Sequence, residues 1–223
     1  MESASKRFFN PYVGKEYTKG INGKRVLVIG ASFYCPKHDC IHFKECTNSE
    51  TKDSSPFNAI CPPYNKNPKE KYELADEPKF TIEDHEQYKA YKNFTKCINR
   101  IENMDGDAWD RLAFTNYVQF FVPTVYTYKS YLSERDLEAF FETIKILRPN
   151  VVVLWGTVIN EALQDKRYLV EESTNAESYI WHLRIPDEED IITLVNCYHP
   201  SSSSWHQDID GFTDILKRAL EIE

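Results

Sequence analysis

The chain contains the stretch IITLVNCYHPSSSSW at residues 191–205. Its first five residues, from Ile191 to Val195, form an aliphatic and β-branched run that is typical of a buried strand. His199 follows that strand, and open α/β sheets bind their ligands at the carboxyl ends of strands. The serines that come next suit contact with a phosphate backbone, and Trp205 suits insertion between bases. The alternative interpretation is a structural histidine that precedes a solvated loop.

Three further runs predict buried strands, and each one ends at a glycine or a polar residue. These runs are residues 24–29 before Gly30, residues 112–116 ending at Asn116, and residues 151–155 before Gly156. The run at 151–155 is wholly apolar, as expected for a strand that is covered on both faces. Residues 179–185 predict an edge strand.

Amphipathic helices are predicted between these strands. Apolar residues recur at spacings of three and four within residues 82–102, 133–147 and 209–220. Ser133 is the expected N-cap of the second helix, and a shorter helix is predicted at 157–163. Helices that alternate with buried strands predict an α/β fold, a three-layer α/β/α domain around a central, mostly parallel four-stranded sheet.

The composition predicts one domain without a membrane span. The chain has 223 residues, of which 41% are hydrophobic, so we assign residues 1–223 to a single domain with one core. The longest apolar run, Val151–Trp155, is too short to cross a bilayer, and the first residues lack the apolar stretch of a secretory signal. We therefore expect an intracellular, cytoplasmic protein with no membrane partner. No coiled-coil pattern or large apolar helix face is present, so we expect a monomer.

The net charge of −8 counts against a strongly electrostatic nucleic-acid binder. This charge does not exclude DNA as a partner, because the local distribution of charge steers binding more than the sum does. The sequence has no long basic run, so a DNA site must depend on a local arrangement of residues.

Gly30, Asn116 and His199 each stand at the carboxyl end of a predicted strand. In a parallel sheet such ends share one edge and can line one pocket. Gly30 would offer exposed backbone amides, and the carboxamide of Asn116 has a donor and an acceptor in one plane, which can match the edge of a base. His199 can donate a hydrogen bond to a developing oxyanion. The alternative for Asn116 is a turn former at the end of a strand.

Four segments, in this order, resemble the motifs of the uracil-DNA glycosylase superfamily. They are a strand with a glycine turn at Ile29–Cys35, a strand ending in asparagine at Phe114–Gln119, a helix, proline, strand and glycine at Ile146–Thr157, and a His-Pro-Ser loop at Tyr198–Ser201. The resemblance covers the chain from about Arg25 to Leu220. It implies the uracil-DNA glycosylase-like fold.

The resemblance implies an enzyme that hydrolyses the N-glycosidic bond of uracil, or of a related damaged base, flipped out of DNA. By position, His199 would donate to the base oxygen on which negative charge develops, and Asn116 would read the edge of the base. Tyr34 falls where some members of the superfamily place a tyrosine that blocks the thymine methyl group. A stacking aromatic is expected downstream of the first motif, at Phe57 or Phe43.

The resemblance also implies a DNA-binding surface around the His-Pro-Ser loop. Gly30 and the serines Ser201, Ser202 and Ser203 would contact the DNA, and Trp205 would press into the minor groove as a wedge. We expect DNA with a damaged base to be the partner and base excision repair to be the role.

The first motif departs from the family pattern, because Ala31 and Ser32 stand where vigorous members have a residue that activates water. Ser32 can position water but is a poor base at neutral pH, and Asp39 or another acid is an alternative. Two other functions therefore stay open. One is a weak or inactive member of the same fold that binds nucleic acid, and the other is a pocket for a free nucleoside or nucleobase.

A loop insertion rich in cysteine and histidine is predicted at about residues 35–80. Four cysteines and two histidines lie within 27 residues of it: Cys35, His38, Cys40, His42, Cys46 and Cys61. Zinc held by the four cysteines would order this long loop, although their spacings fit no tight zinc-finger pattern, and free thiols are the alternative. Some members of the superfamily hold an iron–sulfur cluster, but Phe120 and Phe121 replace its cysteine beside the second motif, so a cluster is less expected here. No cofactor is expected to be required for catalysis.

Overall fold

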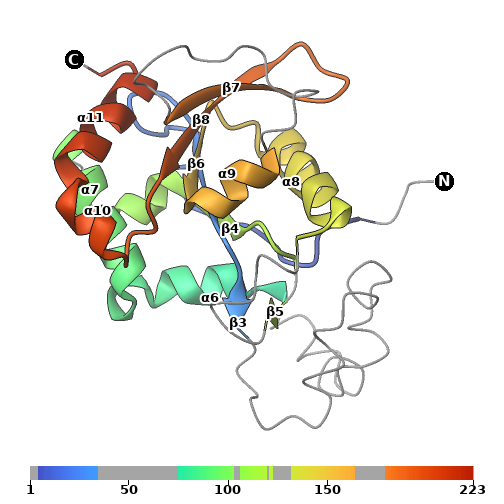
Figure 1. The fold of residues 1–223 in the computed structure, drawn as a ribbon, viewed down its shortest axis with the longest axis horizontal. Helices are drawn as coiled ribbons and strands as arrows, with labels where there is room; N and C mark the ends of the chain where they lie inside the picture. Colours follow the sequence, from blue (N-terminus) through green and yellow to red (C-terminus); the bar gives the residue numbers. More distant parts are fainter. Residues whose placement is uncertain are drawn as a thin grey trace, which may run out of the picture.

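The computed structural model describes residues 5–34, 75–102, 106–119, 121–122, 132–163 and 179–222. Its main feature is a six-stranded sheet with the strand order β1-β4-β2-β6-β8-β7 (Figure 1). The strands are β1 (Tyr12–Val13), β2 (Val26–Gly30), β4 (Leu112–Asn116), β6 (Val151–Trp155), β7 (Ile180–Arg184) and β8 (Ile191–Cys197). A separate two-stranded sheet pairs β3 (Phe33–Tyr34) with β5 (Phe121–Val122).

The four central strands are parallel to one another and correspond to the four predicted buried strands. All residues of β2, β4 and β6 are buried, which explains why these strands are continuous apolar runs. The prediction of a four-stranded sheet is wrong, because β1 and β7 add an antiparallel strand at each edge. The prediction of an edge strand at 179–185 is confirmed by β7, whereas β1 has only two residues and gives no periodic signal.

The register of the central strands brings the strand ends together. Gly30 pairs with Asn116, and Trp155 pairs with Cys197, two residues before His199. Beyond the strands, the carbonyl oxygens of Gly30 and Ala31 accept hydrogen bonds from the peptide nitrogens of Tyr117 and Val118, at 2.8 and 3.0 Å. The turns after β2 and β4 are therefore fixed to each other.

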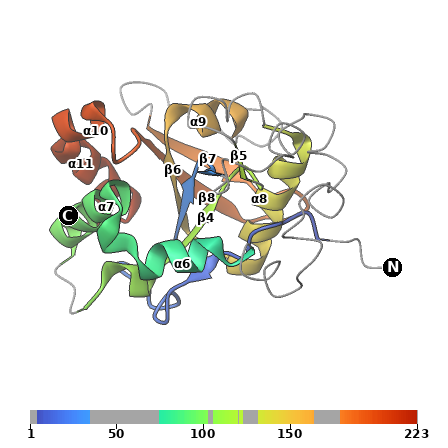
Figure 2. The same cartoon turned by 90° about the horizontal axis from the view of Figure 1, so that it is seen from below.

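Helices lie on both sides of the main sheet, as the three-layer prediction requires (Figures 1 and 2). Helices α7, α10 and α11 lie on one side, and α8 and α9 lie on the other. The helices and their bounds are α6 (Glu77–Glu83), α7 (Lys89–Ile101), α8 (Glu134–Leu147), α9 (Thr157–Leu163), α10 (Ser203–Gln207) and α11 (Ile209–Ala219), with short 3-10 helices η1 (His85–Gln87) and η2 (Ala108–Arg111).

The single helix predicted at residues 82–102 is wrong in its first part. The structure has α6, η1 and α7 there, because Tyr88 is extended, with φ −104° and ψ 124°, and α7 begins only at Lys89. Nδ1 of His85 lies 2.9 Å from the carbonyl oxygen of Ile82, which satisfies a terminal carbonyl of α6 with a side chain. The predicted loop insertion also extends too far, since residues 77–80 belong to α6.

The capping of α8 confirms the role predicted for Ser133. Both the peptide nitrogen and the hydroxyl of Ser133 donate to Oδ2 of Asp136, each at 2.9 Å. Oδ1 of the same carboxylate accepts the peptide nitrogen of Gln119 at 2.8 Å. Asp136 is only 1% exposed, so this bonding connects the start of α8 to the segment that follows β4.

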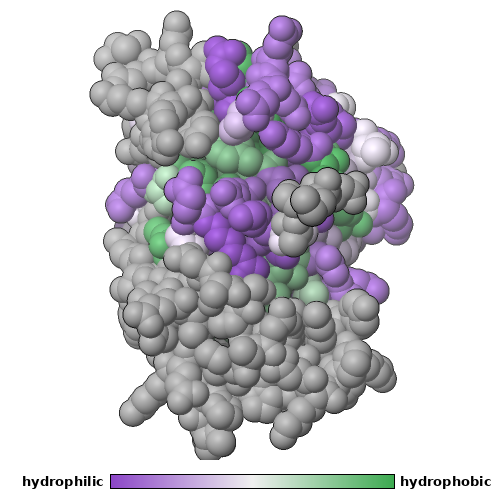
Figure 3. Space-filling view, turned by 90° about the vertical axis from the view of Figure 1, so that its right-hand side faces the viewer, coloured by the Kyte–Doolittle hydropathy of each residue, from purple (hydrophilic) through white to green (hydrophobic). Residues whose placement is uncertain are grey.

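No helix of the described segments is both long and apolar enough to cross a membrane. Figure 3 shows the face on the right-hand side of Figure 1, where hydrophilic residues cover much of the described surface and apolar residues form narrow bands between them.

Candidate functional site

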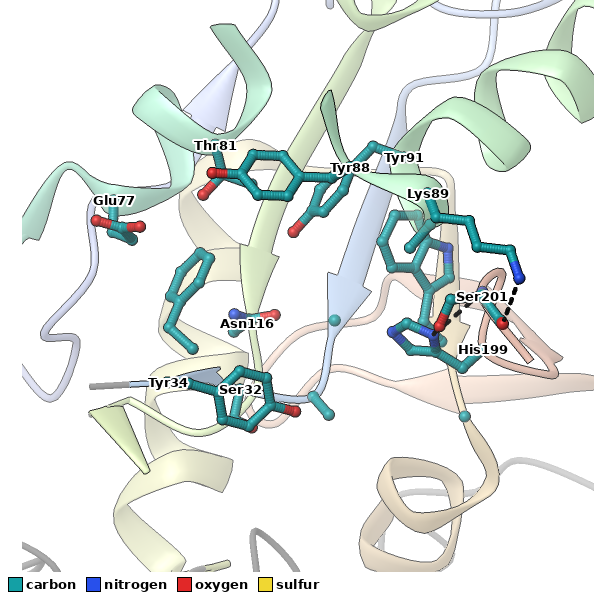
Figure 4. A pocket seen from close by; sticks show the side chains of 16 residues that line it. Ser32, Tyr34, Glu77, Thr81, Tyr88, Lys89, Tyr91, Asn116, His199 and Ser201 are labelled. Carbon is teal, nitrogen blue, oxygen red and sulfur yellow. Dashed lines mark hydrogen bonds between the residues drawn. The ribbon is translucent and has the colours of Figure 1, made fainter. Parts of the chain in front are cut away.

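A cavity of about 560 Å³ lies at the carboxyl ends of β2, β4, β6 and β8 (Figure 4). Gly30, Asn116 and His199 all line this cavity, so the convergence predicted for the three strand ends is confirmed. The lining also includes Ala31, Ser32, Phe33, Tyr34, Glu77, Thr81, Tyr88, Lys89, Ala90, Tyr91, Trp155, Gly156 and Ser201. Its size lies within the range of pockets that bind small molecules.

Asn116 packs directly against Gly30. A Cβ atom added at Gly30 would lie 2.2 Å from Oδ1 of Asn116, so only glycine fits there. The close contact places the amide oxygen of Asn116 over the Cα of Gly30, where a Cα–H group can contact the oxygen. The amide nitrogen of Asn116 lies on the side of the carboxamide away from Gly30. Figure 4 shows that Nδ2 lies toward Glu77 and that Oδ1 lies toward the side of His199.

The carboxamide of Asn116 is 3% exposed, and its Nδ2 has no hydrogen-bond partner among the described residues. A buried donor without an acceptor is costly, at about 1–3 kcal/mol. Because Asn116 lines the cavity, an acceptor atom of a ligand can satisfy this nitrogen. Asn116 is therefore prepared to receive a polar ligand.

Gln119 supports Asn116 from behind. Its Nε2 donates to the carbonyl oxygen of Asn116 at 2.7 Å, and its Oε1 accepts the peptide nitrogens of Phe8 and Phe9 at 3.0 and 3.2 Å. Gln119 is 3% exposed and is itself held by the carboxylate of Asp136. One side chain thus connects the end of β4, the N-terminal segment and the start of α8.

Replacing Gln119 with leucine should destabilise the protein, because three backbone groups of Asn116, Phe8 and Phe9 would lose their buried partner. Each buried polar group without a partner costs about 1–3 kcal/mol, so we expect a total loss of at least about 2 kcal/mol in the free energy of unfolding. Urea denaturation measures it. Gln87→Leu is the control, since Gln87 bonds only Asp84 on the surface. Equal stability of the two variants would contradict the role of Gln119.

His199 is held in one tautomer by the residue two positions later. Its Nδ1 accepts the peptide nitrogen of Ser201 at 3.3 Å and lies 2.8 Å from the hydroxyl of Ser201. Burial lowers the pKa of His199 below its ordinary value, so the ring is neutral at physiological pH. A neutral imidazole that accepts at Nδ1 carries its proton at Nε2. Figure 4 shows that Nε2 points into the cavity, where it can donate to a ligand.

Two neighbours fix the His199 loop in place. The ring of Trp155 meets the ring of His199 edge to face, with centroids 5.8 Å apart and an interplanar angle of 78°. Nδ2 of Asn93, on α7, donates to the carbonyl oxygen of Pro200 at 2.8 Å. The imidazole is thus oriented by both the sheet and α7, which favours a rigid donor.

Ser32 and Tyr34 also line the cavity, as the first motif predicts. Burial raises the pKa of Tyr34, against a smaller lowering by the hydroxyl of Ser32, so the phenol stays protonated. Tyr34 is 41% exposed, and in Figure 4 its hydroxyl points away from Glu77. Ala31 and Ser32 bring no carboxylate to this part of the cavity.

The opposite wall of the cavity was not predicted from the sequence. It comes from α6 and the start of α7, which supply Glu77, Thr81, Tyr88, Lys89 and Tyr91. Burial raises the pKa of Glu77. Burial also raises the pKa of Tyr91, and the negative charge of Glu77 raises the pKa of Tyr91 further. Tyr88 and Tyr91 fall in the apolar spacing of the helix predicted at 82–102, and that spacing predicts a packed helix face rather than a site. The only available signal was the polar Glu77 beside Pro78, a pattern of helix starts.

The first turn of α7 faces the cavity through Lys89, Ala90 and Tyr91. The side chain of the N-cap residue Tyr88 does not bond the first peptide nitrogens of α7, and no capping bond to them is seen among the described residues. Nζ of Lys89 lies 3.4 Å from the carbonyl oxygen of Ser201, beside the His199 loop. A helix N-terminus and an ammonium group together favour an anionic group at this rim.

The prediction of Trp205 as an exposed wedge is wrong. Trp205 is 2% exposed and packs against Phe94 and Phe212, with ring centroids 6.3 and 4.7 Å away. The hydroxyl of Ser202 accepts the peptide nitrogen of Trp205 at 3.2 Å, which caps α10 and turns the indole into the core. Of the serines, Ser201 lines the cavity, Ser202 serves as this cap, and Ser203 is exposed at the start of α10.

The remaining predicted residues lie outside the described residues. They are the stacking candidates Phe43 and Phe57 and the metal candidates Cys35, Cys40, Cys46 and Cys61. Within the described segments, no group of three or more histidine, cysteine or acidic side chains could hold a metal ion. Cys97 and Cys197 are free cysteines buried in the core.

Comparison with protein-family models gives no match for this chain, and comparison with curated proteins gives none either. The chemistry of the site therefore has to be inferred from its own geometry. A neutral imidazole donor, a buried carboxamide and aromatic walls can together hold a planar heterocycle and stabilise negative charge on it.

Proposed function

We propose that the cavity receives a uracil-type base flipped out of DNA and that the protein hydrolyses its N-glycosidic bond. The observation that carries this proposal is the order of hydrogen-bonding groups along the cavity. From right to left in Figure 4 these groups are Nε2–H of His199, Oδ1 of Asn116 and Nδ2 of Asn116, which form a donor, an acceptor and a donor. The edge of uracil presents the complementary acceptor, donor and acceptor in O2, N3–H and O4.

His199 would act on the leaving base. Water adds to C1′ of the sugar while the bond from C1′ to N1 breaks, and the electron pair of that bond leaves with the base. Negative charge then develops on O2, where the Nε2–H of His199 can donate. Because the pKa of His199 is lowered by burial, the donor is a neutral imidazole rather than an imidazolium. Ser32, which lines the cavity, would orient the water but is a poor base.

DNA is the proposed partner, and the protein would act on it inside the cell as a monomer. The cavity alone does not hold a nucleic-acid strand, so contacts with phosphates must come from its rim. The uncapped start of α7 and Lys89 supply such a contact beside Ser201. This local arrangement supports a phosphate contact in spite of the net charge of −8. The cluster at Cys35–Cys61 stays a proposed structural zinc site.

Replacing Lys89 with alanine should weaken DNA binding regardless of base sequence, because one phosphate contact is lost. We expect the slope of log Kd against log salt to fall by about 1. Fluorescence anisotropy with a labelled single-stranded oligonucleotide at several salt concentrations measures this slope. The control is Lys96→Ala, since Lys96 is exposed on α7 and does not line the cavity. An equal slope for both variants would show that the rim of α7 does not meet phosphate.

The experiment that tests the proposed function is base release from an oligonucleotide with a single uracil, in single- and double-stranded form. Abasic sites are revealed by alkaline cleavage, and matched oligonucleotides with thymine and cytosine serve as comparison. Release of uracil that depends on enzyme concentration supports the proposal. If neither form releases uracil when the protein is in excess, the proposed hydrolase activity is wrong.

A second candidate is a protein that binds such a base without cleaving it, either in nucleic acid or as a free nucleoside. The absence of a carboxylate at Ala31 and Ser32 is the observation that favours this candidate. It predicts saturable binding of the uracil oligonucleotide or of deoxyuridine without base release. Salt dependence separates the two ligands, because binding of the oligonucleotide releases the counterions condensed on its phosphates, whereas an uncharged nucleoside has none to release.

A further inference from the structure

Glu77 is the one carboxylate among the described residues that line the cavity. It stands in the first turn of α6, and Figure 4 shows its side chain at the opposite side of the cavity from His199, with Asn116 between them. Glu77 has no ion pair among the described residues, and burial raises its pKa. A partly buried carboxylate at the edge of a binding pocket, with no cation beside it in the described part of the chain, requires an explanation.

Glu77 does not occupy the position of a residue that activates water. In a pyrimidine nucleotide the oxygen O2 is next to N1, which carries the sugar. A residue that activates water must therefore lie on the same side as His199, which meets O2. Figure 4 shows Glu77 across the cavity from His199, on the side of Nδ2 of Asn116. With a pyrimidine seated as proposed, Glu77 would face the part of the base that follows O4, namely carbon 5.

We propose that Glu77 is a specificity-determining residue that accepts a hydrogen bond from a substituent on carbon 5 of the pyrimidine, and that an amino group ends the preferred substituent. This inference rests on the proposed function, since it assumes a pyrimidine seated between His199 and Asn116. The substrate class is then a uracil-type base with an aminomethyl or similar donor group at carbon 5.

The chemistry of the far wall supports a donor at this place. An ammonium group forms a charge-assisted bond with a carboxylate, a hydroxyl group forms a weaker one, and a methyl group forms none while still removing water from the carboxylate. In Figure 4 the hydroxyl of Tyr34 points away from Glu77, so this phenol does not occupy the carboxylate as a hydrogen-bond donor. The hydroxyl groups of Thr81 and Tyr88 lie on the same wall and add polar surface around a substituent.

The test is kcat/KM for base release from oligonucleotides with one uracil, thymine, 5-hydroxymethyluracil or 5-aminomethyluracil. For the natural chain we expect rates in the order aminomethyl, hydroxymethyl, methyl, with about 10- to 100-fold between the first and the last. Glu77→Gln should remove most of the advantage of aminomethyl over hydroxymethyl, measured as the ratio of the two kcat/KM values. Glu83→Gln is the matched control, because Glu83 is exposed on the same helix and pairs with Lys79.

Two results would overturn the inference. One is a natural chain that does not distinguish aminomethyl from methyl. The other is a Glu77→Gln variant in which all four rates fall equally, which would make Glu77 a catalytic residue instead. If no base is released at all, the proposed function is contradicted. The Kd values for the same four oligonucleotides then test whether Glu77 selects the substituent on carbon 5. Tighter binding of aminomethyl that Glu77→Gln abolishes supports the inference, and equal Kd values reject it.

Discussion

Replacing His199 with alanine should lower kcat for uracil release by about 10²- to 10³-fold. The variant loses the Nε2–H donor that meets the oxygen on which negative charge develops, and removal of one such donor has an effect of this size. The fold should persist, because His199 is only partly buried and its Nδ1 bonds only to Ser201. Single-turnover kinetics with a uracil oligonucleotide measures the loss.

His182→Ala is the matched control for this experiment. His182 is exposed on β7 and does not line the cavity, so its removal should leave the rate unchanged. Thermal unfolding of both variants verifies that the comparison is made between folded proteins. If His199→Ala kept the full rate per folded molecule, the catalytic assignment of His199 would be wrong.

Replacing Gly30 with alanine should remove measurable base release, with a loss of at least about 100-fold in kcat/KM. The new Cβ would lie 2.2 Å from Oδ1 of Asn116 and 3.3 Å from Cζ of Phe114, so the carboxamide must leave its position. Without that carboxamide the edge of the base is not matched, and sites that read such groups discriminate strongly. The clash should also lower the free energy of unfolding by about 1–3 kcal/mol.

A double variant separates these two effects. Adding Asn116→Ala to Gly30→Ala removes the atom that clashes, so stability should recover in part while activity stays absent. Urea denaturation and base release measured side by side distinguish the two quantities. Natural activity in Gly30→Ala alone would show that the contact of Asn116 with Gly30 does not position the carboxamide.

The sheet could be predicted because its central strands are buried on both faces. Such strands have no polar face, so each is recognisable in the sequence as a short aliphatic run. Because the strands are parallel, the residues at their carboxyl ends are predicted to lie at one edge of the sheet. Gly30, Asn116 and His199 share this edge for the same reason. The strand β1 is different, because two residues have no period and their pairing with β4 depends on the tertiary structure.

The opposite wall of the site could not be predicted in the same way. Glu77 and Tyr91 reach the cavity because α6 and α7 fold over the ends of the strands, and no local pattern specifies that placement. The break at Tyr88 is equally hidden, since the apolar spacing continues across it. The burial of Trp205, by contrast, has signals in the sequence. The serine three residues before Trp205 is an N-cap signal, and Trp205, Phe212 and Leu216 recur at helical spacing, which is typical of a buried helix face.

The strand that precedes His199 is held from both sides. Within the described segments, β8 is hydrogen-bonded to β6 along one edge and to β7 along the other. Separating β8 from the main sheet would therefore break residue pairs on both of its sides, so local opening at this strand requires a large free energy. His199 stands two residues beyond the end of β8 and shares this resistance to opening, which keeps the imidazole in register with Gly30 and Asn116.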